Sequence, residues 1–282
     1  MGATVYDIIT EKIVTQLEEG TVPWHRPWSG GEPPKNLISK KPYRGINIFL
    51  LAAAGYASPY WLTFNQVKGL DGSIKKGSKS TMVIFWKKNS YKKVNDQGEE
   101  ETKQSMILRY YRVFNTEQTT GIKEGKIPEM QVRDFEPIEE CERIFENMPS
   151  QPNLTFDEQQ AYFRPSTDTV NMPKPETFSS EEEYYSTLFH EITHATGHDT
   201  RLGRHKADKC THNFGSKDYS KEELIAEMGA AFLCGHCGID TTIDNSAAYI
   251  KGWLSKLRND TKVVIMAAGK AQKASDYILG NE

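Results

Sequence analysis

The residues of this chain best suited to chemistry are two histidines and a glutamate in the stretch His190-Glu191-Ile192-Thr193-His194. Because an α-helix has about 3.6 residues per turn, histidines four positions apart share one helix face, where both imidazoles can reach one metal ion. This HExxH spacing predicts a Zn²⁺ site. Glu191 is the expected catalytic base, which accepts a proton from a zinc-activated water during hydrolysis of a peptide bond.

A third protein ligand is needed, because a catalytic zinc is usually held by three protein ligands and a water. His198 is one candidate, four residues after His194 at the expected helix end. The extended pattern HExxHxxGxxH would need a histidine where Thr200 stands, which argues against that version of the site. The other candidates are Glu223 and Glu227, about thirty residues downstream.

The run from Glu223 to Glu227 resembles the ExxA(D/E/N) helix of several HExxH families, the gluzincin arrangement. In those families the first glutamate binds zinc, and the residue four positions later supports a ligating histidine. The resemblance favours Glu223 as the third ligand of one zinc per chain, with Glu227 as its support. If Glu223 instead forms a helix-capping box with Ser220, Glu227 becomes the ligand.

Two helices are expected to position these groups. Ser179 and Ser180 precede three successive glutamates, which start a helix with acids at its positive end, and this helix should cover 181–194 and end near Gly197. A second helix should begin after residue 220 and carry both glutamates on to residue 233. The alternative is an exposed helix face with two solvated histidines, but apolar residues beside the motif give the first helix a buried face.

The remaining patterns predict an α+β protein of two domains, at 1–127 and 153–282, joined by a junction at 128–152. The polar stretch 87–105 is expected to form a long hairpin tip rather than strand. Helices are expected at 5–17, 47–54, 63–70, 137–147, 245–257 and 263–279, and strands at 82–86, 106–114, 161–164 and 169–172.

Charge is divided unequally between the two halves. Residues 1–127 hold 19 Lys and Arg against 12 Asp and Glu, whereas residues 128–282 hold 16 against 26. Such a split suggests two units with different partners. The longest apolar run has about 12 residues, short of the roughly 20 that a membrane span needs, and no signal peptide is evident. Four scattered cysteines fit a reducing cytoplasm, so we expect a cytoplasmic protein with no membrane partner.

The basic half has the ingredients of a surface for single-stranded nucleic acid, which combines cations with rings on which bases stack. The ordinary explanation is that aromatic residues form the core and lysines face solvent. The candidates for nucleic-acid contacts are Trp24, Arg26, Trp28, Tyr43, Arg44, Trp61, Lys75, Lys76, Arg109 and Arg112.

The order of these motifs resembles the ArdC antirestriction family over nearly the whole chain. The N-terminal likeness rests on residues 19–28, 42–47, 61–64 and 112–118, and the C-terminal likeness on 178–198 and 219–227. The resemblance implies an N-terminal domain that binds single-stranded DNA (ssDNA) and a C-terminal zincin-like metallopeptidase domain. It also implies carriage on a mobile element, such as a conjugative plasmid, where such proteins protect incoming DNA from restriction. By position, His190, His194 and Glu223 would hold the metal and Glu191 would be the base.

The expected function is therefore an antirestriction protein that binds ssDNA without sequence preference and carries a zinc-dependent peptidase domain acting on a host protein. One alternative is a non-catalytic ssDNA-binding protein with a structural or vestigial zinc site. Another is a metallopeptidase whose N-terminal half binds a protein partner. A metal-dependent nuclease is disfavoured, because HExxH supplies one zinc rather than an acidic two-metal cluster.

Overall fold

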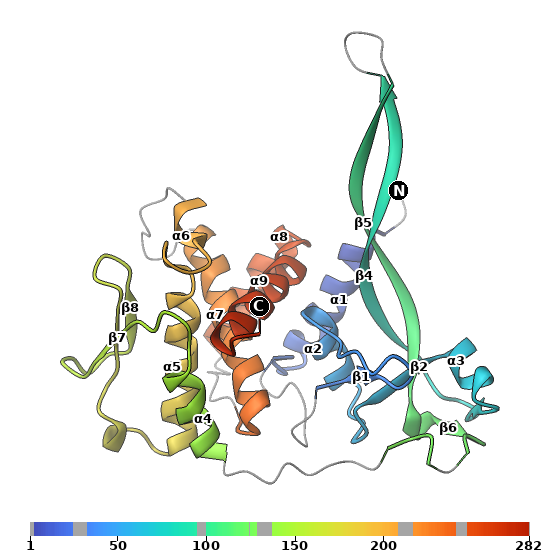
Figure 1. Cartoon of the computed structure of the whole chain (residues 1–282), viewed down its shortest axis with the longest axis horizontal. Coiled ribbons are helices and arrows are strands. Elements are labelled where there is room, and N and C mark those ends of the chain that lie inside the picture. The colour runs from blue at the N-terminus through green and yellow to red at the C-terminus, as the bar shows by residue number, and fades with distance from the viewer. Residues whose placement is uncertain are drawn as a thin grey trace.

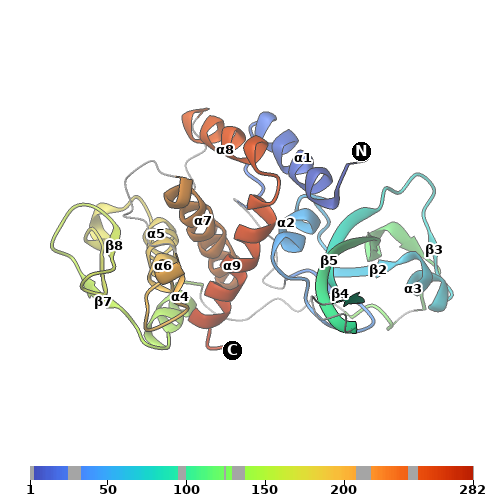
Figure 2. The same ribbon diagram turned by 90° about the horizontal axis from the view of Figure 1, so that it is seen from above.

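The computed structural model describes residues 3–24, 33–94, 100–123, 125–128, 137–207, 217–240 and 247–281. The chain forms two α+β domains. Both views place a group of helices in the middle of the molecule, with a four-stranded sheet toward one end and a three-stranded sheet at the other (Figures 1 and 2). Among the described helices, none is long and apolar enough to cross a membrane.

The N-terminal domain is built around a sheet with strand order β1-β2-β5-β4, in which β1 and β2 run parallel and the other neighbours antiparallel. A small ribbon pairs β3 with β6. Its elements are α1 (Val5–Glu18), β1 (Lys35–Asn36), α2 (Ile46–Ala52), β2 (Tyr60–Thr63), α3 (Phe64–Gly69), β3 (Ser73–Ile74), β4 (Thr81–Val94), β5 (Glu100–Asn115), η1 (Thr116–Gln118) and β6 (Thr119–Thr120).

Helix α1 follows the sequence pattern closely. Thr4 caps it and exchanges hydrogen bonds with Asp7, the capping box that satisfies free backbone N–H groups of the first turn. The apolar residues at helical spacing, Ile9, Ile13 and Leu17 among them, are buried. The helix ends just before Gly20, whose φ of +78° suits a residue without a side chain.

Strands β4 and β5 correct the expectation of a polar tip at 87–105. They stay paired from Thr81↔Val113 out to Val94↔Glu100, so most of that stretch is strand (Figure 1). Backbone hydrogen bonds need no apolar side chains, and cross-strand charge pairs such as Lys92–Glu100, with Nζ and Oε2 2.7 Å apart, assist the pairing. Charge alone was therefore misleading evidence for a loop.

The C-terminal domain contains a three-stranded sheet of order β7-β9-β8, with β7 and β9 parallel and β8 antiparallel to β9. Helix α4 packs with α5 and α7 around a second core that buries the free thiols of Cys141, Cys234 and Cys237. The elements are α4 (Pro137–Glu146), β7 (Asn153–Thr155), β8 (Tyr162–Arg164), β9 (Thr169–Asn171), η2 (Pro175–Thr177), α5 (Glu181–Ala195), α6 (Arg204–Ala207), α7 (Lys217–Cys237), α8 (Ala247–Asn259) and α9 (Val263–Ile278).

Helices α5 and α7 approach closely at one glycine. A Cβ added to Gly229 of α7 would stand 2.5 Å from Cγ2 of Thr193 on α5, so a larger residue would push the helices apart. This crossing brings the two candidate glutamates of α7 toward the histidines of α5. Helix α7 begins at Lys217, earlier than expected, and Ser220 therefore lies inside the helix.

One hydrophobic core joins the two domains, which we call the shared core. It contains residues of α1, α2 and the base of the β4–β5 hairpin together with residues of α7, α8 and α9. Phe49 of α2 stacks on Phe232 of α7 with ring centroids 4.8 Å apart, and Trp24 meets Trp253 of α8 edge to face. Contacts of this kind mean that neither domain is complete in its packing without the other.

Candidate metal centre

Helix α5 presents the two histidines of the motif toward one point. Its start is capped by Ser180, whose Oγ accepts a hydrogen bond from the backbone N–H of Glu183. Near its end, the Nε2 atoms of His190 and His194 lie 3.1 Å apart. Both rings are largely shielded from solvent, so the helix holds two metal-binding nitrogens in a partly enclosed place.

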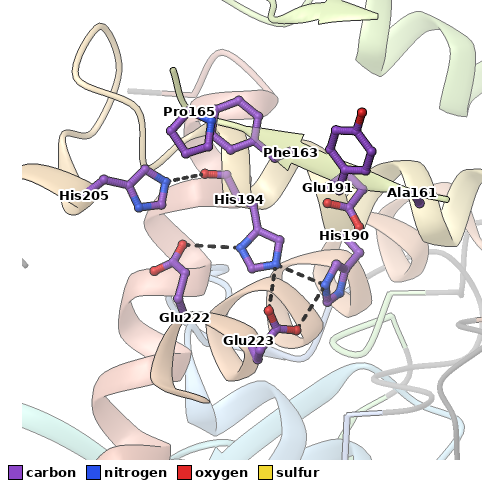
Figure 3. Close-up of a pocket in the computed structure, with 10 residues that line it drawn as sticks. Ala161, Phe163, Pro165, His190, Glu191, His194, His205, Glu222 and Glu223 are labelled. Carbon is purple, nitrogen blue, oxygen red and sulfur yellow. Dashed lines mark hydrogen bonds and ion pairs between the residues drawn. The ribbon is translucent and has the colours of Figure 1, made fainter. Parts of the chain in front are cut away.

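Glu223 completes a set of three ligand atoms. Its carboxylate oxygens lie 3.5 Å from Nε2 of His190 and 3.4 Å from Nε2 of His194. One donor atom from each residue falls within 4.8 Å of the others, and Figure 3 shows the carboxylate facing both rings. Two imidazoles and one carboxylate are a ligand set that suits Zn²⁺ and related divalent ions. The residues therefore fit a metal ion.

The other proposed ligands lie differently. Glu227 is one helical turn beyond Glu223 and half-buried. The capping box of Ser220 with Glu223 is not formed at the start of α7, because Ser220 lies within the helix. His198 bonds through Nδ1 to Thr200 Oγ1 at 2.8 Å, and its ring packs against Phe163. Of the three candidates, Glu223 is the one found against both histidines.

The charges of this site are arranged to attract a cation. Burial lowers the pKa of His194, but contacts with Glu222 and Glu223 outweigh burial and raise it to about 10. Burial likewise raises the pKa of Glu223, yet both histidines outweigh it and hold that pKa well below its usual range. These shifts show that the carboxylates favour positive charge at this point, which is where a dication would bind.

Glu222 and Arg204 form a support for His194 that sequence reasoning missed. Oε1 of Glu222 lies 3.8 Å from Nδ1 of His194, the ring nitrogen turned away from Glu223 (Figure 3). Arg204 Nη2 lies 2.6 Å from the same carboxylate, and Arg204 also donates to Thr196 Oγ1 and the carbonyl of Thr193. Groups that hold the second nitrogen of a ligating histidine fix its ring orientation. The sequence signal for this support was the doublet Glu222-Glu223, in which a second carboxylate stands beside the proposed ligand.

Glu191 and both histidines line a cleft of about 280 Å³. The opposite wall is strand β8 with its neighbours Ala161 and Pro165, and β8 is an edge strand of its sheet. His205 donates from Nε2 to the carbonyl of His194 at 3.1 Å (Figure 3). A carboxylate beside a metal site, in a cleft bordered by an open strand edge, is an arrangement that can hydrolyse an extended peptide.

The aromatic candidates for nucleic-acid contacts need correction. Trp24, Tyr43 and Trp61 are 0 %, 8 % and 2 % exposed, so these rings are core residues and cannot stack on bases. The ordinary explanation of buried aromatics holds for these three residues. Two further candidates, Arg26 and Trp28, lie outside the described residues.

The charged candidates lie on the surface in different places. Arg44 forms an ion pair with Asp276 of α9 and so bridges the two domains. Lys75 donates from Nζ to the carbonyl of Glu117, and Lys76 is exposed. Arg109 and Arg112 are exposed on β5. The structure therefore does not gather the predicted set into one surface.

Two family models match adjoining parts of the chain. Residues 3–114 match the N-terminal domain of the anti-restriction factor ArdC, and residues 139–270 match a zincin-like metallopeptidase family. Among curated proteins, an uncharacterised protein of Sinorhizobium fredii, y4eC, is 33% identical over 97% of this chain and 91% of that protein. The DNA primase TraC of Escherichia coli is 33% identical over 98% of this chain, which spans 20% of the primase.

Solved structures agree with these matches. The metal-free crystal structure of the antirestriction protein ArdC from plasmid R388 is 34% identical and superposes with a TM-score of 0.78, covering 99% of this chain and 98% of that chain. The Mn(II)-bound structure of the same protein is 33% identical with a TM-score of 0.76 over the same shares. The zincin-like domain and the manganese-bound relative together indicate a divalent metal. The chain thus belongs to the ArdC antirestriction family, with an ArdC N-terminal domain followed by a zincin-like metallopeptidase domain.

Proposed function

We propose that this chain is an antirestriction protein that binds ssDNA and cleaves a host protein with a zinc-dependent peptidase site. The observation that carries the peptidase part is the convergence of His190, His194 and Glu223 beside Glu191 in one cleft. The primase relatives are far longer than this chain, and their activity is not transferred to it. The proposed setting is the cytoplasm.

The proposed chemistry divides the work among a few residues. A zinc ion held by the two histidines and Glu223 would act as a Lewis acid toward water and a peptide carbonyl. Glu191 accepts the proton of the attacking water on its carboxylate and returns it to the leaving amine. Strand β8 offers its open edge to an extended peptide, whose backbone then lies along the cleft.

The variant Glu191→Gln tests this assignment, because glutamine keeps the size of the side chain and loses the base. We expect cleavage of a dye-quenched casein probe, with and without an ssDNA oligomer, to fall about 10²- to 10⁴-fold while zinc content is unchanged. Glu182→Gln, an exposed glutamate on the same helix, is the matched control.

Full activity of metal-loaded Glu191→Gln would contradict the role of Glu191. A wild-type chain that binds one zinc and does not cleave the probe, either with or without the ssDNA oligomer, would favour the non-catalytic alternative. Metal content is measured on the same preparation as activity, so that loss of the metal is not mistaken for loss of the base.

The DNA part of the proposal rests on the basic N-terminal half and on the family. Affinity for a labelled oligo(dT) should fall steeply as salt rises, because each phosphate contact releases counterions, with a slope of about −0.7 per contact. Unchanged affinity between low and moderate salt, or no binding, would favour a domain that binds a protein partner instead.

A further inference from the structure

One face of the β4–β5 hairpin carries exposed rings and cations, and we call it the hairpin face. In antiparallel strands, residues directly opposite each other project to the same side, and successive pairs alternate. The pairs Phe85↔Arg109, Lys87↔Ile107 and Tyr91↔Lys103 therefore share this face with Tyr111, which lies opposite Val83. The pairs between them, such as Ile84↔Tyr110 and Lys88↔Met106, project to the opposite face.

The rings of the hairpin face are open to solvent. Phe85, Tyr111 and Tyr91 are 39 %, 38 % and 45 % exposed, which is unusual for large apolar side chains on a strand. Phe85 and Tyr111 already contact each other, with centroids 5.4 Å apart. At roughly 3.3 Å per residue, Phe85 and Tyr91 are about 20 Å apart along the strand. The rings therefore span a length suited to several nucleotides.

Cations stand between these rings. Lys87 and Arg109 are exposed and, among the described residues, have no acidic partner. Lys103 lies nearer the tip, where its Nζ is 3.8 Å from Oε2 of Glu101, the one described acid on this face. Unneutralised positive charge between exposed rings is complementary to a phosphate backbone with bases on either side.

Both faces are engaged in the fold at the base of the hairpin, where Val83 and Val113 of the hairpin face are fully buried in a core of their own. On the opposite face, Ile84 and Leu108 are buried in the shared core, and Trp86 packs edge to face on Tyr6 of α1 with centroids 6.4 Å apart. The hairpin projects from the body of the molecule, away from the three-stranded sheet at the other end (Figure 1). The opposite face also exposes Trp86, Tyr110 and Met106. The hairpin face differs in carrying three exposed rings, those of Phe85, Tyr111 and Tyr91, with the cations Lys87, Arg109 and Lys103 between them.

We propose that the hairpin face is the surface on which ssDNA lies, with bases stacked on Phe85, Tyr111 and Tyr91 and phosphates near Lys87, Arg109 and Lys103. This placement rests on the proposed ssDNA binding and assigns that binding to one surface of the chain. Stacking on rings tolerates any base, and contacts to phosphate carry no sequence information. The hairpin face therefore binds without sequence preference.

Two pairs of neighbouring residues allow a matched test on the full chain. Tyr111 and Tyr110 are both exposed but lie on opposite faces, and so do Lys87 and Lys88. Affinity for oligo(dT) is measured for the alanine variant of each. We expect about tenfold weaker binding for Tyr111→Ala and less than about twofold change for Tyr110→Ala. Tyr111→Phe keeps the ring and should bind as the wild type does.

The lysine pair gives a second readout. Lys87→Ala should reduce the salt slope by about 0.7, whereas Lys88→Ala should leave the slope unchanged. Unchanged helical circular dichroism and melting temperature in all variants show that the body of the chain still folds. Tyr91 lies near the tip of the hairpin, where the fold depends least on the side chain. Tyr91→Ala therefore repeats the stacking test at a second position.

The outcomes separate this placement from the function on which it rests. If the wild type does not bind oligo(dT), ssDNA binding itself is wrong. If the wild type binds and both members of each pair weaken binding equally, or neither does, the DNA lies elsewhere and the hairpin face is wrong. Weakening confined to Tyr111, Tyr91 and Lys87 supports the placement.

Discussion

The metal cleft and the hairpin face show two ways in which one chain arranges charge. In the cleft, the partly buried carboxylate of Glu223 lies 3.5 Å from His190 and 3.4 Å from His194, and Glu222 pairs with Arg204. On the hairpin face, Lys87 and Arg109 stand in solvent without an acidic partner among the described residues. The first arrangement holds ligand atoms in fixed positions around one small ion. The second leaves positively charged side chains available to a long polyanion.

This difference has consequences for how each region responds to change. A metal site depends on a few atoms in fixed positions, so the loss of one ligand or of its support is felt strongly. A surface that binds a strand sums many weaker contacts, so single substitutions change affinity gradually. The shared core contains residues from the base of the hairpin and from α7, so both regions depend on it.

Phe49→Ala should have the largest effect on stability and tests whether the two regions are independent. Phe49 is 0 % exposed and stacks on Phe232 across the domain boundary. Deleting a buried phenyl ring costs about 3–5 kcal/mol of the free energy of unfolding. We expect hydrogen exchange to accelerate in α2 and α7 together, measured by mass spectrometry.

Phe64→Ala is the control, because Phe64 is 49 % exposed and a surface substitution should change stability by no more than about 0.5 kcal/mol. Acceleration in α2 alone would show that the domains unfold separately. In that case the shared core is a contact surface between two independent units rather than one cooperative core.

Glu222→Gln sharpens the account of the cleft. The substitution removes the charge that lies 3.8 Å from Nδ1 of His194 and pairs with Arg204. We expect zinc affinity, measured by competition with a chelating dye, to fall about tenfold. Binding of oligo(dT) should not change. Zinc affinity equal to that of the wild type would mean that Glu222 serves the fold of α7 and not the orientation of His194.

Glu140→Gln should have the smallest effect and lies outside both regions. A hydrogen bond from Arg143 lowers the pKa of Glu140 below its ordinary value of 4.5, and this outweighs burial, which raises it. A carboxyl with a depressed folded pKa stabilises the fold above its unfolded pKa, and this contribution is lost as pH falls through the folded pKa.

The substitution should therefore cost about 0.2–1 kcal/mol at pH 7 and nothing once the carboxyl of the wild type is protonated. Urea unfolding at pH 7 and again at a pH low enough to protonate the carboxyl of the folded wild type measures the difference. Equal losses at both values would show that Glu140 contributes through packing rather than charge. Zinc affinity and DNA affinity should be unaffected at pH 7.

Local patterns in the sequence predicted much of the cleft and some of the fold. The four-residue spacing of His190 and His194 defines a shared helix face wherever that helix lies. The start of α5 at Ser180 and the stop of α1 at Gly20 were likewise readable, because caps involve neighbouring residues. These features depend on contacts between residues close in sequence.

The length of β4 and β5 could not be predicted from local sequence patterns. The charged residues at 87–94 and 100–105 contain no apolar alternation, yet they pair as strands. Pairing in a two-stranded ribbon comes from backbone groups of two segments, and neither segment alone reveals it. The burial of Trp24 and Trp61 could not be predicted either, because aromatic residues suit both a core and a stacking surface.

Residue types and helical spacing are local properties, so which residues can hold a metal and where charge is concentrated could be predicted from the chain alone. The packing of distant segments was needed to show that Glu223 faces both histidines, that Glu222 and Arg204 support one of them, and that exposed rings and cations share one face of the hairpin. Those outcomes depend on how α5 crosses α7 at Gly229 and on which surfaces the shared core covers. Both are set by packing between segments distant in the chain.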